Sequence, residues 1–129
     1  MRYDEFVAEV RDRGQYLDQD QAERAVKAVL TVLGERLVGG EPKDLAGQLP
    51  GDLSEFLLKR ADQEESYGVD GFIDRVAEEL SGATAETARQ DATAVLTTLA
   101  ETVTAGEFTD VLAQLPREYT DLLDSMPDA

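Results

Sequence analysis

Apolar residues recur along most of the chain at spacings of three and four, the pattern of helices that bury one face. The clearest stretch predicts a long helix, opened by Asp18 or Asp20 and closed by Gly39-Gly40. Its apolar stripe is wide enough for a central helix and comprises Ala22, Val26, Val29, Leu30, Leu33 and Leu37. No segment sustains the alternation of a strand, so the sequence predicts an all-α fold.

A shorter helix is predicted at each side of this long one. Before it, Asp4 is expected to cap a helix that runs to about Arg13 and ends at Gly14. Its buried side is predicted to carry Phe6, Val7 and Val10. After it, Pro42 is a favoured first helical residue, and a short helix is expected over residues 42 to 48.

A break and a further helix follow the short one. Leu49 precedes Pro50 and is biased out of the helical region, so the chain should turn there. Pro50 then begins a helix whose inward positions are Leu53, Phe56 and Leu57. Four helices therefore make up the first half of the chain.

The same pattern occurs twice. A shift of 66 residues aligns 4–58 with 70–124 without a gap, and 17 of the 55 aligned positions are identical. We interpret this as a tandem duplication of a unit of about four helices, related by a pseudo-twofold axis and packed through the long helices. The second long helix should run from a Thr84 cap to Gly106, through Ala88, Ala92, Val95, Leu96, Leu99 and Val103.

The repeat sets the expected boundaries. Residues 1–62 form the first unit, 63–68 a linker, 69–124 the second unit and 125–129 a frayed tail. The linker lies in a polar stretch, KRADQEESYG, that has no apolar rhythm. We expect the two units to share one core and form one compact domain.

Both units contain the motif G-E-x-x-D-[LV]-x-x-Q-L-P, at 40–50 and 106–116. Its structural interpretation is a corner between helices, in which the glutamine hydrogen-bonds backbone groups left open at the break. Its functional interpretation is that the two corners line a cleft between the units. The candidate binding residues are then Glu41, Asp44, Gln48, Glu107, Asp110 and Gln114.

The charge is strongly acidic: 28 Asp and Glu face 12 Lys and Arg, for a net charge of −16. Nucleic acid and anionic membranes would repel this chain, so neither is an expected partner. The acidic residues are spread evenly and Arg outnumbers Lys, which is typical of a cytoplasmic protein of a salt-accumulating halophile. The alternative is an acidic mesophilic protein of ordinary type. The first residues contain no apolar signal-peptide core, which also favours a cytoplasmic protein.

Histidine and cysteine are absent, which excludes a catalytic triad, a thiol nucleophile and the common zinc sites. No phosphate-binding glycine loop is present. We therefore expect no catalytic residue, no cofactor and no metal, and predict a non-catalytic helical interaction or structural protein that binds another protein or itself. The alternative is a carboxylate-based metal-binding protein or hydrolase, with its site between the units around Glu41, Asp44, Glu107 and Asp110.

Two long stretches carry a family resemblance. AVLTVLGERLVGGEPKDLAGQLPGDLSEFLL and its copy AVLTTLAETVTAGEFTDVLAQLPREYTDLL resemble the domain-of-unknown-function family 2267. The resemblance implies a small all-helical protein of prokaryotes, haloarchaea included, with no assigned activity and no catalytic residue. The second copy departs from the pattern with Phe108 in place of Pro42 and Ala100 in place of Gly34.

Overall fold

A computed structural model describes residues 2–37, 41–59, 69–80 and 83–113, and these residues contain seven helices and no strand. The helices are α1 (Tyr3–Gly14), α2 (Gln19–Arg36), α3 (Glu41–Ala46), α4 (Gly51–Leu58), α5 (Val69–Glu79), α6 (Ala85–Thr102) and α7 (Ala105–Ala113). The all-α prediction is confirmed for this part of the chain. None of these helices is long and apolar enough to cross a membrane.

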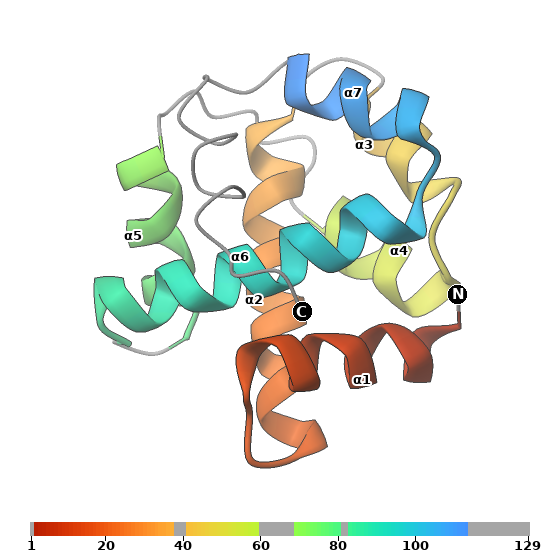
Figure 1. The fold of residues 1–129 in the computed structure, drawn as a ribbon. Coiled ribbons are helices and arrows are strands. Elements are labelled where there is room, and N and C mark those ends of the chain that lie inside the picture. Colours follow the sequence, from red (N-terminus) through yellow and green to blue (C-terminus); the bar gives the residue numbers. More distant parts are fainter. Residues whose placement is uncertain (1, 38–40, 60–68, 81–82, 114–129) are drawn as a thin grey trace.

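Helix α2 is the centre of the fold. It runs through the middle of the molecule and α6 crosses it, while α1, α4 and α5 pack around the pair (Figure 1). Residues 28–36 of α2 are all buried, because neighbouring helices cover this part from several sides. A helix enclosed in this way belongs to the core rather than to a surface layer.

The predicted apolar stripes form one core. Every stripe residue expected on α2 and α6 is buried, as are Phe6, Val7 and Val10 of α1. Phe6 and Phe72, from α1 and α5, are among the largest fully buried side chains. Each fully buried leucine or phenylalanine contributes about 1.5–3 kcal/mol by leaving water, so this common core is what stabilises the helix arrangement.

Side-chain caps fix the starts of the two long helices as predicted. The Asp18 carboxylate accepts a hydrogen bond from the Gln21 N–H at 2.9 Å, and the Thr84 hydroxyl oxygen accepts one from the Thr87 N–H at 3.1 Å. The predicted end of α6 at Gly106 is wrong, because the helix stops at Thr102. Thr104 instead caps the next helix, its hydroxyl oxygen accepting from the Glu107 N–H at 3.2 Å.

The predicted cap of α1 needs correction, whereas its predicted end at Gly14 is confirmed. Asp4 lies within the first turn, and the residue at the cap position is Arg2, whose side chain makes no capping hydrogen bond. Gly14 is the last helical residue, and Gln15 takes the left-handed conformation at φ 57°. A Cβ at Gly14 would lie 2.8 Å from Cζ of the Tyr16 ring and closer still to its edge, so the ring would have to shift if Gly14 were replaced.

The first corner differs from the prediction in where its two helices end and begin. Helix α3 covers Glu41–Ala46, Gly47 and Gln48 form a turn, and Pro50 occupies the cap position before α4. The Ser54 hydroxyl donates to the Ala46 carbonyl at 2.8 Å and so ties α4 back to the end of α3. The second corner, at 114–116, lies outside the described residues.

Candidate functional site

The carboxylates predicted to line a cleft lie on α3 and α7, and these two short helices do contact each other. Asp44 and Asp110 are exposed, and Glu107 is half-buried. The side chains of Glu41 and Gln114 lie outside the described residues. Among the residues described, no group of three or more Asp or Glu side chains is placed to hold a metal ion.

Gln48 has a different role from the one predicted. Its Oε1 accepts a hydrogen bond from the Thr104 N–H at 2.8 Å, and its Nε2 donates to the Thr104 hydroxyl at 3.4 Å. Through its side chain, Gln48 therefore hydrogen-bonds the backbone and side chain of Thr104 at the start of α7, and not the backbone groups between α3 and α4. Its side chain joins the first half of the chain to the second, which is a structural role.

A cavity of about 590 Å³ lies elsewhere, and sequence reasoning missed it. The loop between α1 and α2, the middle of α2, the end of α4, the end of α5 and the start of α6 form its walls. Small side chains leave the space open: Ala25 and Ala28 on α2, and Ala83 just before α6. The other lining residues are Tyr16, Gln21, Arg24, Lys27, Thr31, Lys59, Glu79, Leu80, Thr87 and Asp91. We call this the cationic cavity.

The charge of the cationic cavity is opposite to that of the whole chain. Arg24, Lys27 and Lys59 are three of only 12 basic residues in a chain of net charge −16. Two carboxylates, Glu79 and Asp91, also line the space, so the described lining residues carry one more positive charge than negative. The described lining of this cavity is therefore less acidic than the chain as a whole.

One residue pair joins the two halves of the chain at this cavity. The Tyr16 hydroxyl donates a hydrogen bond to the Asp91 carboxylate, across 75 positions of sequence. Burial raises the pKa of the Asp91 carboxyl, and the hydrogen bond from Tyr16 offsets part of that rise. Burial, with Asp91 beside it, also raises the pKa of Tyr16, so the phenol stays protonated and acts as a donor rather than a nucleophile.

One sequence signal could have indicated that Asp91 has a partner. Asp91 occupies the position aligned with Ala25, on the inward side of the second long helix, and it is 5% exposed. A carboxylate is rarely buried there without a partner, so the position predicts a donor nearby. Nothing local in the sequence identifies that donor as Tyr16.

A comparison with protein families agrees with the resemblance noted in the sequence. The family described as an uncharacterized conserved protein, DUF2267, matches residues 3–122. The chain belongs to the DUF2267 family. The DUF2267 description assigns no chemistry, so it adds no site residue to the cationic cavity. A search of curated proteins finds no match.

Replacing Tyr16 with phenylalanine should lower the free energy of unfolding by about 1–2 kcal/mol, because the buried Asp91 carboxylate loses its donor. Asp91→Asn keeps an acceptor for the phenol and is the matched control. Urea unfolding at neutral pH measures both. Equal stability of the Tyr16→Phe variant and the wild type would show that the hydrogen bond contributes nothing.

The same variant should change the alkaline pH dependence of stability. An ordinary tyrosine has a pKa of 10.0, and that of folded Tyr16 is higher. Between these values the folded state holds a proton that the unfolded state has released, so stability falls as pH rises above about 10. Urea unfolding at stepped alkaline pH should show a steeper fall for the wild type than for Tyr16→Phe. Parallel curves would contradict this account of Tyr16.

Proposed function

We propose that this DUF2267 protein is a non-catalytic helical binding protein of a salt-accumulating cytoplasm, and that its binding site is the cationic cavity. The observation that supports this most is the gathering of Arg24, Lys27 and Lys59 around one hollow of a chain with net charge −16. The occupant is an anionic group. It belongs to a small molecule, to a protein partner or to a second copy of the chain.

The size and lining of the cavity support binding. A volume of about 590 Å³ falls in the range of sites that enclose small molecules. At molar salt the Debye length is about 3 Å, so exposed charges act only on groups in direct contact. Arg24, Lys27 and Lys59 are exposed, so we expect them to act through direct contact with a bound anion.

Two exposed leucines support a macromolecular partner at the same place. Leu17 is 88% exposed and follows Tyr16, while Leu58 is 39% exposed and precedes Lys59. Both therefore lie next in sequence to residues of the cationic cavity. A protein partner that places an acidic side chain in the cavity would gain apolar contacts with these leucines.

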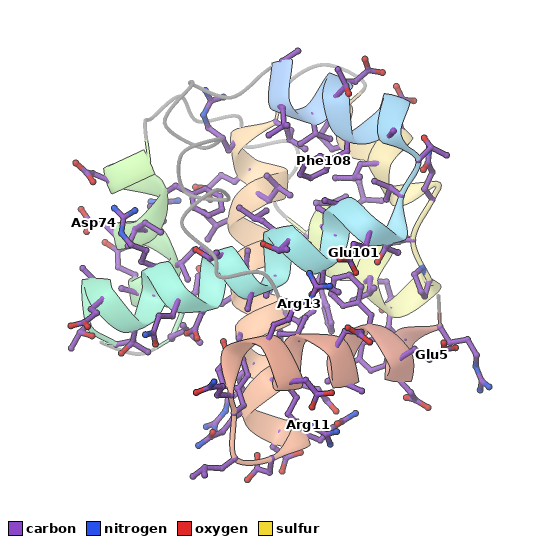
Figure 2. The ribbon with its side chains drawn as sticks, viewed as in Figure 1. Glu5, Arg11, Arg13, Asp74, Glu101 and Phe108 are labelled. Atoms are coloured by element: carbon purple, nitrogen blue, oxygen red, sulfur yellow. The ribbon has the colours of Figure 1, made fainter. Side chains whose placement is uncertain are left out.

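We also propose that the fold arose by duplication of one helical unit. Helix α1 packs on α6 and α5 packs on α2, which is the crossed pairing that a twofold relation requires. Glu35 of α2 pairs with Arg75 of α5. Glu101 of α6 pairs with Arg13 of α1 (Figure 2). The two glutamates are 66 residues apart and aligned, so each long helix uses the same position to hold the first helix of the other unit.

The halophilic assignment predicts a large dependence of stability on salt. Repulsion within a body of charge −16 falls as the Debye length shrinks from about 10 Å at 0.1 M to about 3 Å at 1 M salt. Thermal unfolding followed by circular dichroism should show a midpoint that rises steadily with KCl over this range. A midpoint that stays constant or falls would contradict the assignment.

Titration calorimetry in molar KCl tests the binding function. Inorganic phosphate should bind the wild type at a single saturable site. The variant Arg24→Glu/Lys27→Glu should lose that site, whereas Lys43→Glu, an exposed charge on α3, should keep it. A chain that binds no anion, captures no protein and sediments as a single copy would contradict the proposal. Saturable binding of Mg²⁺, Mn²⁺ or Ca²⁺ would instead favour the carboxylate-based alternative.

A further inference from the structure

The charges of the cationic cavity are separated by structural element. All three cations come from α2 and from Lys59, the residue after α4, and these two helices pack together. Both carboxylates come from α5 and α6, which also pack together. The side of the cavity that the first half of the chain builds is therefore positive, and the side that the second half builds is negative.

Asp91 is the best-defined group on the negative side. Its side chain lies at the cavity wall, is almost fully buried and is held by the Tyr16 hydroxyl. The hydroxyl proton is engaged by this bond, so the phenol oxygen presents only acceptor lone pairs to anything else in the cavity. Asp91 and Tyr16 together form a place for a hydrogen-bond donor, preferably a cationic one.

A ligand with a single charge matches only half of this lining. A free anion is attracted by Arg24 and Lys27 but brings its charge toward the Asp91 carboxylate. A free cation is attracted by the Asp91 carboxylate but brings its charge toward Arg24 and Lys27. A zwitterion satisfies both sides, since each of its charges faces the opposite sign in a partly enclosed space where ionic contacts are stronger than in open water.

We infer that the cationic cavity binds a small zwitterion of the α-amino acid type, its carboxylate against Arg24 and Lys27 and its ammonium group against Asp91 and Tyr16. The inference rests on the proposed binding function and names the ligand class for the same cavity. The small side chains of Ala25, Ala28 and Ala83 leave room for an apolar ligand side chain. Leu80 adds a further apolar contact.

Titration calorimetry in molar KCl with three matched probes tests this inference. The probes are leucine, 4-methylpentanoate, which lacks the ammonium group, and 3-methylbutylamine, which lacks the carboxylate. Leucine should bind with one-to-one stoichiometry, about ten-fold or more tightly than either analogue. Equal binding of 4-methylpentanoate overturns the zwitterion and leaves the anion-binding function standing. Binding of phosphate but of none of the three probes also overturns the zwitterion and leaves the anion-binding function standing. Failure of all four probes overturns the zwitterion, and it overturns the binding function as well when the chain captures no protein and sediments as a single copy.

Variants assign each end of the ligand. Asp91→Asn keeps the shape and an acceptor for Tyr16, and should remove the preference for leucine over 4-methylpentanoate. Lys27→Gln, which also removes the contact of the ammonium group with the Phe56 ring at 6.0 Å from its centroid, should weaken both of these probes by a similar factor, while Lys43→Gln changes neither. Urea unfolding establishes that each variant is folded. A preference for leucine that survives Asp91→Asn, or binding unaffected by Lys27→Gln, overturns the assignment.

Discussion

Replacing Gly34 with alanine should destabilise the fold by about 3 kcal/mol or more, which lowers the unfolding midpoint by roughly 10 °C. Gly34 lies where α2 and α4 touch. A Cβ there would lie 2.9 Å from the carbonyl carbon of Leu57 and closer still to its oxygen. The obstacle is backbone, which cannot rotate away as a side chain can, so α4 must move and the buried Leu53 and Leu57 lose contacts.

The chain offers matched controls for this prediction. A Cβ at Gly51 or at Gly106 meets no atom within 4 Å, and both glycines lie in helices. Gly51→Ala and Gly106→Ala should leave stability unchanged or raise it slightly, because alanine favours the helix more than glycine does. Chemical denaturation of all three variants separates the close approach from helix propensity. A Gly34→Ala variant as stable as these controls would show that α2 and α4 are not in contact at this point.

Replacing Arg75 with methionine should lower the free energy of unfolding by about 3 kcal/mol. The Arg75 guanidinium pairs with Glu35, whose side chain is fully buried at 0% exposure. Removing the cation leaves that carboxylate less compensated in the interior, which costs more than the loss of a surface contact. The estimate stands at the low end for buried pairs because 35% of the Arg75 side chain is exposed.

Arg89→Met is the matched control for Arg75→Met. Arg89 pairs with Asp70 at 3.8 Å, and both side chains are well exposed, so its loss should cost less than about 0.5 kcal/mol. The double variant Glu35→Met/Arg75→Met should recover much of the lost stability, because it removes the buried charge together with its partner. Equal effects of Arg75→Met and Arg89→Met would contradict a special role for the buried glutamate.

The features of the fold that the sequence predicts well are those set by neighbouring residues. The apolar stripes of α2 and α6 follow from helical periodicity. The caps at Asp18 and Thr84 follow from the N–H groups of the first helical turn, which have no partner within the helix and need a nearby acceptor. The end of α6 was mispredicted because two local signals compete. Gly106 resembles a helix terminator, but the Thr104 hydroxyl already caps the next helix.

The features that sequence reasoning missed depend on contacts between distant segments. Tyr16 meets Asp91 across 75 positions, and Gln48 meets Thr104 across 56. Gly14 ends α1 as predicted, but the sequence does not show that the Tyr16 ring lies close to where its Cβ would be. The cationic cavity could not be predicted for the same reason, since Lys59 and Arg24 meet there only after α4 has packed on α2.

Mapping amide chemical shifts during ligand titration tests the central claim, that the cationic cavity is the binding site. With leucine or inorganic phosphate in molar KCl, the account predicts saturable shifts at Tyr16, Lys27, Thr87 and Asp91, which lie on separate elements around one space. Residues of α3 and α7, including Asp44 and Asp110, should stay unperturbed. Shifts centred on α3 and α7, or spread evenly over the acidic surface, would contradict the claim.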